Sequence, residues 1–335
     1  MFKTVRWVAM STLLKVNNLK THFKRNKRVI RAVDGIDFEI KKGETVALVG
    51  ESGCGKSMTS LSIMGLVPTP GGKIVDGEIL LDGVDLVGLP EKKMYEIRGK
   101  EIAMIFQEPM TSLNPVLTIG DQLTSVIIHH LKIGKQEAEK KAIGMLELVG
   151  FSDPKKVLKD YPHRLSGGMR QRVMIAMAMS CNPQLLIADE PTTALDVTIQ
   201  AQVLELMKDI SKKFSTSILL ITHDLGVVSE VADRVVVMYA GQIVEIADIE
   251  ELFEDSLHPY TTGLINSVPT IDGQVERLQS IKGNVPAPGA VITGCKFAAR
   301  CSQAFERCRN EMPAMRKINQ SRSVRCFLYD GVGGE

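Results

Sequence analysis

Residues 44–57 read ETVALVGESGCGKS. The apolar run ETVALV predicts a buried strand, and a helix is expected from about Lys56 to Gly65. The loop between them fits G-x-x-x-x-G-K-[ST], in which glycines let backbone N–H groups approach phosphate oxygens and the helix N-terminus adds its positive dipole end. Lys56 is expected to reach the β- and γ-phosphates, and the Ser57 hydroxyl to bind Mg²⁺. The predicted phosphate site comprises Gly50, Glu51, Ser52, Gly53, Cys54, Gly55, Lys56 and Ser57.

A second strand, within LLIADE at residues 185–190, carries two carboxylates at its end. In open α/β sheets, ligands gather at the carboxyl ends of the strands. Asp189 is therefore expected to hold Mg²⁺, and Glu190 is placed to orient or deprotonate an attacking water. Together, the two motifs predict a magnesium-dependent nucleotide site.

Strands alternate with helices on both sides of these motifs. Alternation of apolar and polar residues predicts short strands over 11–48 and 73–90, and a hairpin over 234–248 that turns at Ala240-Gly241. Further strands are expected at 101–106, 185–188 and 217–222, and helices at 120–150, 155–183 and 198–213. This order predicts one α/β core with a parallel sheet.

The composition and the hydrophobic periodicity of the chain change after about Glu250. Residues 282–290, KGNVPAPGA, are rich in Pro and Gly and lack long periodic runs. We therefore expect four parts: an N-terminal extension at 1–11, a nucleotide-binding domain at 12–250, a linker or small appendage at 251–294, and a cysteine-rich tail at 295–335.

Composition excludes several classes of protein. The 335 residues are 44% hydrophobic and 24% charged, which argues against a disordered chain. The net charge of +2 and an aromatic content of 5% argue against a nucleic-acid partner. No stretch reaches about 18 consecutive apolar residues, and the apolar run near the N-terminus is too short for a secretory signal, so the chain is expected to remain in the cytosol.

Residues 165–171 read LSGGMRQ and begin an expected helix. A serine cap and a helix N-terminus form a second anion site. The segment resembles the LSGGQ signature of ABC-type ATPases, with Met169 and Arg170 ahead of the usual Gln. The resemblance implies a P-loop ABC-type nucleotide-binding fold, with a RecA-like parallel-sheet core and antiparallel β and α-helical subdomains. It also implies a head-to-tail dimer in which Ser166, Gly167, Gly168, Met169 and Gln171 cover the nucleotide bound by the second subunit.

Other positions match the same family in sequence order. Gln107 resembles the Q-loop glutamine, which contacts Mg²⁺ and the water and senses the membrane partner. Asp196 resembles the D-loop residue that crosses the dimer interface, and His223 the switch histidine that contacts the γ-phosphate. Phe23 is the candidate for stacking on adenine. The alternative is that Phe23 is an aromatic residue of the core. This resemblance covers roughly residues 12–250.

A second resemblance concerns the residues that follow. The segments that carry it are HPYT at 258–261, VP at 268–269, GNVP at 283–286, GCKFAARC at 294–301 and QEPMTSLNP at 107–115. They are similar to segments of ATPase subunits of oligopeptide/dipeptide permeases. The resemblance implies ATP-driven import of di- and oligopeptides, at the cytoplasmic face of the cell membrane. It also implies three kinds of partner: a similar but distinct ATPase subunit, two membrane-spanning permease subunits, and an extracytoplasmic peptide-binding protein. Nickel or another small solute as cargo, and a soluble ABC-type ATPase, remain open as alternatives.

Four of the six cysteines lie in the tail, at Cys295, Cys301, Cys308 and Cys326. Their spacing, C-x5-C-x6-C-x17-C, differs from that of zinc ribbons and bacterial ferredoxins. Four thiolates suit a [4Fe–4S] cluster or Zn²⁺, and free thiols are the third possibility. Relatives with this tail resemble iron–sulfur-containing permease subunits, which favours the cluster, in a structural role.

Overall fold

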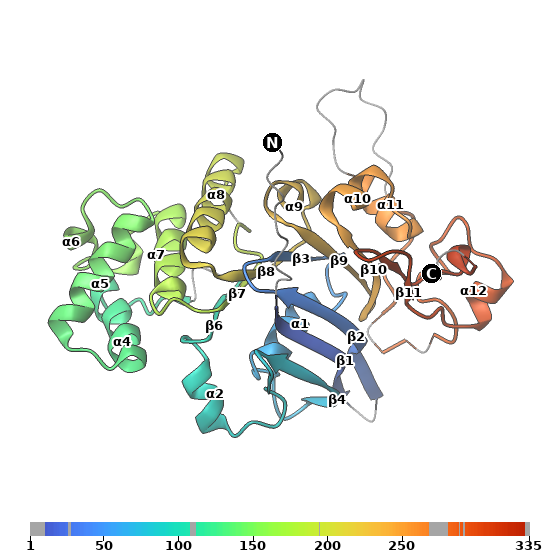
Figure 1. The fold of residues 1–335 in the computed structure, drawn as a ribbon, viewed down its shortest axis with the longest axis horizontal. Coiled ribbons are helices and arrows are strands. Elements are labelled where there is room, and N and C mark those ends of the chain that lie inside the picture. The colour runs from blue at the N-terminus through green and yellow to red at the C-terminus, as the bar shows by residue number, and fades with distance from the viewer. Residues whose placement is uncertain are drawn as a thin grey trace, which may run out of the picture.

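The computed structural model describes residues 11–25, 28–107, 112–193, 195–267, 281–287, 289–290 and 292–331. The expected N-terminal extension at 1–11 therefore lies almost wholly outside the described residues, as do Val268 and Pro269. The described elements form two sheets, a group of helices at one end and a C-terminal part at the other (Figure 1).

The larger sheet contains the parallel core that the sequence predicts. Its strands lie in the order β11-β12-β10-β9-β3-β8-β7-β6, and the five from β9 to β6 run parallel. The strands of this sheet are β3 (Thr45–Val49), β6 (Ile102–Ile105), β7 (Leu185–Asp189), β8 (Ser217–Thr222), β9 (Arg234–Tyr239), β10 (Gln242–Asp248), β11 (Arg316–Lys317) and β12 (Ser323–Val324). The predicted hairpin is β9–β10, and positive φ angles at Ala240 (46°) and Gly241 (82°) form its tight turn.

A second, antiparallel sheet has the order β2-β1-β4-β5. Its strands are β1 (Thr12–Arg25), β2 (Arg28–Lys41), β4 (Gly72–Leu81) and β5 (Val84–Asp85), and α2 (Glu91–Ile97) follows. The first two strands are 14 residues each, so the short strands expected over 11–48 are in fact long ones. Their buried face packs against α1 (Lys56–Ile63) in one hydrophobic cluster, which holds the phosphate-loop helix between the two sheets.

A group of helices lies at the end of the molecule where β6 is the edge strand of the large sheet (Figure 1). They are α4 (Ile119–Leu131), α5 (Lys135–Leu148), α6 (Pro154–Val157), the 3-10 turn η1 (Pro162–Arg164), α7 (Gly167–Met179), α8 (Val197–Phe214) and, nearer the centre, α9 (Leu225–Val231). Side-chain caps begin several of them: Thr118 caps α4, Ser166 caps α7 and Asp196 caps α8.

The residues that follow Glu250, called the C-terminal extension below, pack back onto the core. Their elements are most of α10 (Ile249–Glu254), then α11 (Pro259–Ile265), α12 (Glu306–Asn310), strands β11 and β12, and the 3-10 turn η2 (Phe327–Tyr329). Strand β12 pairs with β10, and Tyr260 and Phe297 join a hydrophobic cluster with β3 and β9. The extension therefore adds strands to the large sheet and shares a core with it.

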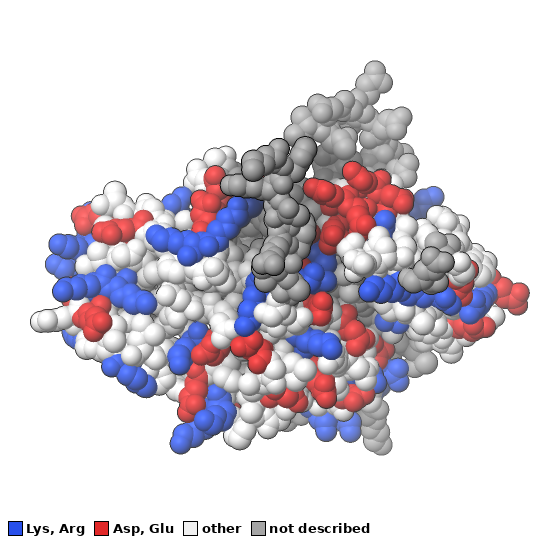
Figure 2. Space-filling view, viewed as in Figure 1, with Lys and Arg blue, Asp and Glu red and all other residues white. Residues whose placement is uncertain are grey.

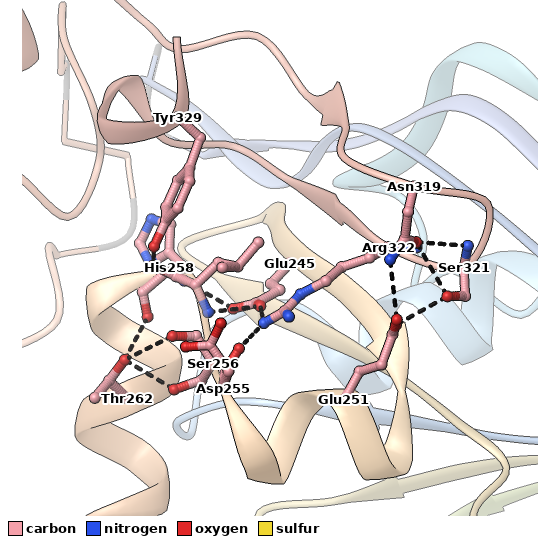
Figure 3. Close-up of polar contacts among 11 residues, drawn as sticks. Glu245, Glu251, Asp255, Ser256, His258, Thr262, Asn319, Ser321, Arg322 and Tyr329 are labelled. Carbon is pink, nitrogen blue, oxygen red and sulfur yellow. Dashed lines mark hydrogen bonds and ion pairs between the residues drawn. The ribbon is translucent and has the colours of Figure 1, made fainter. Parts of the chain in front are cut away.

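An ion pair buried under the extension joins it to β10 (Figure 3). The Glu245 carboxylate lies 3.1 Å from Nη2 of Arg322, and neither side chain is more than 8% exposed. The backbone N–H groups of Leu257 and His258 also donate to Glu245, each at 2.9 Å. Beside this pair, Glu251 accepts hydrogen bonds from Asn319 and Ser321 (Figure 3).

Surface charge is mixed in sign. Lys and Arg are interspersed with Asp and Glu over the face in Figure 2, and acidic side chains gather near α10. Within the described ranges, none of the helices has the length and apolarity needed to cross a bilayer.

Candidate functional site

The parallel strands bring the predicted catalytic segments to one edge of the sheet. The order β3-β8-β7-β6 makes them neighbours, and parallel strands place their carboxyl ends together. The phosphate loop follows β3, His223 follows β8, Asp189 ends β7 and Gln107 comes shortly after β6. Segments separated by more than a hundred residues therefore meet at this edge.

The phosphate loop depends on glycine at its two ends. A side chain at Gly55 would approach the Ala32 carbonyl oxygen to 2.4 Å, and one at Gly50 would approach the Met238 carbonyl oxygen to 2.2 Å. Both residues also have positive φ, which glycine adopts without strain. Gly55 occupies the N-cap position of α1 and has no side chain to cap it, so the first backbone N–H groups of the helix remain directed at the loop.

Lys56 and Ser57 point into the loop and toward the second motif. The Lys56 ammonium group donates to the carbonyl oxygens of Gly50 (2.7 Å) and Glu51 (3.2 Å). The Ser57 hydroxyl donates to Oδ1 of Asp189 at 3.2 Å, and burial raises the pKa of this carboxyl above its ordinary value. Ser52 and Gly53 are exposed at the tip of the loop, whereas Cys54 is buried and its pKa is raised by that burial.

Glu190 is in contact with three other side chains. Its carboxylate accepts from Nε2 of Gln107 (3.1 Å) and from the Thr193 hydroxyl (3.0 Å), and lies 3.2 Å from Nδ1 of His223. Burial raises the pKa of Glu190, but the hydrogen bonds from Thr193 and His223 outweigh it, and the pKa lies below its ordinary value. Glu190 is therefore ionised at neutral pH. The sequence motifs do not indicate a role for Thr193. Its position three residues after Glu190 is the feature of the sequence that would place it near this carboxylate.

The signature segment forms the N-terminus of α7. The Ser166 hydroxyl accepts from the Met169 N–H at 3.3 Å, and Met169 is exposed. Gly168 faces α8, where a side chain would approach Cγ2 of Ile199 to 2.9 Å. Gln171 points inward and is fully buried, so it does not share the exposed face of Met169.

The N-terminus of α7 lies away from the phosphate loop of the same chain. Helix α7 stands with α4–α6 and α8, whereas α1 lies at the centre of the molecule (Figure 1). Asp196 caps α8 by accepting from the Ile199 N–H at 3.0 Å, and its side chain is exposed next to the signature. Both segments therefore face solvent at one end of the molecule.

A cavity of about 710 Å³ opens beside the loop tip. It lies between strand β2, Gly53, the β9–β10 turn and residues 285–287, 289–290 and 292 of the C-terminal extension, and both Arg31 and Lys296 line it. Phe23 does not line this cavity, but its cross-strand partner Ile30 does. The Phe23 ring instead lies against Gly72 of β4.

The prediction of a metal centre in the tail is wrong. Cys295, Cys301, Cys308 and Cys326 are free thiols, and no group of three or more His, Cys, Asp or Glu side chains in the described part of the chain is placed to hold a metal ion. The four line a cavity of about 20 Å³, space for little more than one water. Burial raises the pKa of Cys295 and Cys301, and raises that of Cys326 to about 11.

Comparison with protein families identifies two regions of the chain. The family described as "ABC transporter" matches residues 33–193, and "Oligopeptide/dipeptide transporter, C-terminal region" matches residues 244–308. Among curated proteins, the oligopeptide transport ATP-binding protein AppD of Bacillus subtilis is 64% identical over 97% of this chain and 99% of its own length. The dipeptide transport ATP-binding protein DppD of the same organism is 52% identical over 96% of both chains.

Solved structures agree with this fold. The ATP-binding cassette MJ0796, in a dimeric post-hydrolysis state with ADP and Pi, matches with a TM-score of 0.64 and 27% identity over 71% of this chain and 99% of its own. The cbiO1 protein of Clostridium perfringens, part of an ABC transporter complex, matches with a TM-score of 0.62 over 73% of this chain and 91% of its own. The fold is that of a P-loop ABC ATPase, as the signature segment predicts.

Proposed function

The chain belongs to the ABC transporter family, among the oligopeptide and dipeptide transport ATP-binding proteins, and from this premise we propose that it is the ATP-hydrolysing subunit that powers import of peptides. The observation that carries the proposal is the convergence of Ser57, Asp189, Glu190 and His223 at one sheet edge. The C-terminal match supports peptide, rather than nickel or another small solute, as the cargo.

The residues at the sheet edge suit phosphoryl transfer to water. Backbone N–H groups at the tip of the phosphate loop and at the start of α1, together with the Lys56 ammonium group, bind the phosphates, and Glu190 orients and deprotonates the attacking water. His223 holds the γ-phosphate. Base and ribose extend into the cavity beside Gly53, whose wall includes Ile30, the cross-strand partner of Phe23. Catalysis is then mainly positioning and electrostatic stabilisation.

The oxygen ligands present are those that Mg²⁺ prefers. The Ser57 hydroxyl and the Asp189 carboxylate lie within hydrogen-bond distance of each other. The Gln107 amide is hydrogen-bonded to Glu190, the residue that follows Asp189. When bound, Mg²⁺ neutralises charge that develops on the β- and γ-phosphates.

A second ATPase subunit completes each nucleotide site. The signature residues 166–169 and Asp196 lie away from the phosphate loop of their own chain, so a head-to-tail partner brings its signature to this loop. We infer a similar but distinct chain as that partner. This chain lies at the cytoplasmic face of the cell membrane, where two membrane-spanning permease subunits receive the motion through the Q-loop region, about residues 107–125. An extracytoplasmic protein delivers the peptide.

The experiment that tests this function compares two substitutions. Glu190→Gln keeps the side-chain shape but removes the base, so it retains ATP binding, stabilises the closed dimer and lowers ATP turnover by about a hundredfold or more. Lys56→Ala loses nucleotide affinity. Glu78→Gln, at an exposed position in the antiparallel sheet, is the matched control and keeps full turnover. Normal turnover in Glu190→Gln, or unchanged affinity in Lys56→Ala, contradicts the assigned roles.

A further inference from the structure

The C-terminal extension reaches the phosphate loop through Arg300. Its guanidinium group forms a two-pronged ion pair with Glu51, from Nη1 to Oε2 at 2.6 Å and from Nη2 to Oε1 at 2.9 Å. The two residues are 249 positions apart in the sequence. The Arg300 side chain is only 5% exposed, and its hydrogen bond to Glu51 is the main cause that raises its pKa.

The rest of the Arg300 guanidinium group is held by its surroundings. Nε donates to the Lys282 carbonyl oxygen at 3.1 Å, and Nη1 lies 3.4 Å from the Tyr239 hydroxyl. The aromatic rings of Tyr239 and Phe297 lie within 6 Å of its central carbon, at 5.8 and 5.9 Å. The position of the guanidinium group is thus set by the extension and β9 together.

Tyr260 holds the backbone of the same loop residue. The N–H of Glu51 donates to the Tyr260 hydroxyl at 2.8 Å, and Tyr260 is fully buried against Tyr239 and Phe297. Both the side chain and the N–H of Glu51 are therefore directed at the extension. This explains how a loop that must bind an anion can carry a carboxylate at its second position.

We infer that Arg300 is a positioning residue for nucleotide binding, which neutralises the Glu51 carboxylate and holds it away from the phosphates. This inference rests on the proposed function, because it concerns the same phosphate loop. An unpaired Glu51 would be free to turn toward the loop, where like charges repel and the Lys56 ammonium group would be a competing partner. The extension therefore contributes to ATP affinity from outside the nucleotide-binding core.

A second substitution that neutralises Glu51 separates this role from a purely structural one. On the full chain, calorimetric titration with the magnesium complex of AMP-PNP gives Kd, and thermal unfolding gives Tm. We expect Arg300→Met to raise Kd about tenfold, or about 1.4 kcal/mol. Adding Glu51→Gln removes the uncompensated charge and returns Kd to within about twofold of wild type, although Tm stays low.

The matched control is Arg307→Met in the same extension. Arg307 also forms ion pairs, with Glu311 and Asp330, but contacts no residue of the loop. Its substitution leaves Kd unchanged. The excess Kd of Arg300→Met also shrinks at high salt, since screening weakens the repulsion.

Each outcome bears on a different claim. If the wild type fails to bind AMP-PNP, or if Lys56→Ala binds it equally well, the proposed function fails. If both behave as expected, a wild-type Kd in Arg300→Met, or a double variant as weak as the single one, overturns the inference.

Should Arg300→Met not fold, Arg300→Lys keeps the charge but loses the two-pronged geometry, and we expect a Kd increase of about threefold that Glu51→Gln removes. A wild-type Kd in Arg300→Lys would then count against the role of Arg300.

Discussion

Glu190 has a backbone conformation that is unusual for its residue type. Its φ is 47°, in the left-handed region, where a residue other than glycine costs about 1–3 kcal/mol. The contacts with Gln107, Thr193 and His223 hold it there. Two adjacent carboxyls thus have opposite environments: the pKa of Asp189 is raised by burial, whereas hydrogen bonds lower that of Glu190.

Asp189→Asn tests the magnesium role at the residue scale. Asparagine can still accept from the Ser57 hydroxyl but lacks the charge, so we expect the Mg²⁺ concentration for half-maximal ATPase activity to rise at least about tenfold. Asp82→Asn is the control, since Asp82 lies in the turn between β4 and β5 and pairs with Lys42 at the surface. An unchanged Mg²⁺ midpoint in Asp189→Asn would remove this residue from the metal site.

At the scale of elements, α11 begins with a buried histidine. Nδ1 of His258 accepts from the Tyr260 N–H at 3.0 Å, and Pro259 occupies the first helical position. His258 is 2% exposed, and burial lowers its pKa to about 3. The helix therefore needs this histidine to be neutral, because its cap uses the lone pair of the ring nitrogen.

The consequence is a loss of stability in acid. The unfolded chain has a His pKa of about 6.5, so between that pH and about 3 the unfolded state binds more protons, and stability falls as the pH falls. From this group alone the loss is about 2 kcal/mol at pH 5. His258→Asn retains a cap acceptor that does not titrate. Urea unfolding at pH 7 and pH 5 should show a smaller difference in this variant, and equal differences would exclude His258 as a cause.

At the scale of the molecule, the C-terminal extension and the core share one sheet and one hydrophobic cluster. Strand β12 extends the sheet at β10, and the Glu245–Arg322 pair lies beneath it (Figure 3). Arg322 also donates to the Asp255 carbonyl oxygen. The division of the chain into domains at residues 250 and 294 stays a prediction. Residues before and after position 250 belong to the same hydrophobic cluster.

Arg322→Met should loosen this docking. It leaves Glu245 buried with two backbone N–H donors and no cation, at a cost of about 3 kcal/mol. We expect a lower Tm and faster proteolysis of the extension. Arg316→Met removes a half-exposed pair with Asp330 and should cost less than about 1 kcal/mol. Equal effects of the two substitutions would mean that the buried pair has no special part in docking.

The sequence by itself determined the features that depend on neighbouring residues. The phosphate loop at 50–57, the turn at Ala240-Gly241 and the cap at Ser166 follow from local backbone chemistry, and strand–helix alternation predicts the parallel sheet. The family followed from the order of such motifs along the chain.

Only the tertiary structure decided which distant side chains meet. The contact of Thr193 with Glu190, the inward position of Gln171 and the Arg300–Glu51 pair depend on how elements pack. The tail cysteines are the opposite case: their number suggested a metal centre, but they line a cavity of about 20 Å³, and burial raises the pKa of Cys295, Cys301 and Cys326. Composition and spacing do not carry this information, because burial and distance are properties of the folded chain.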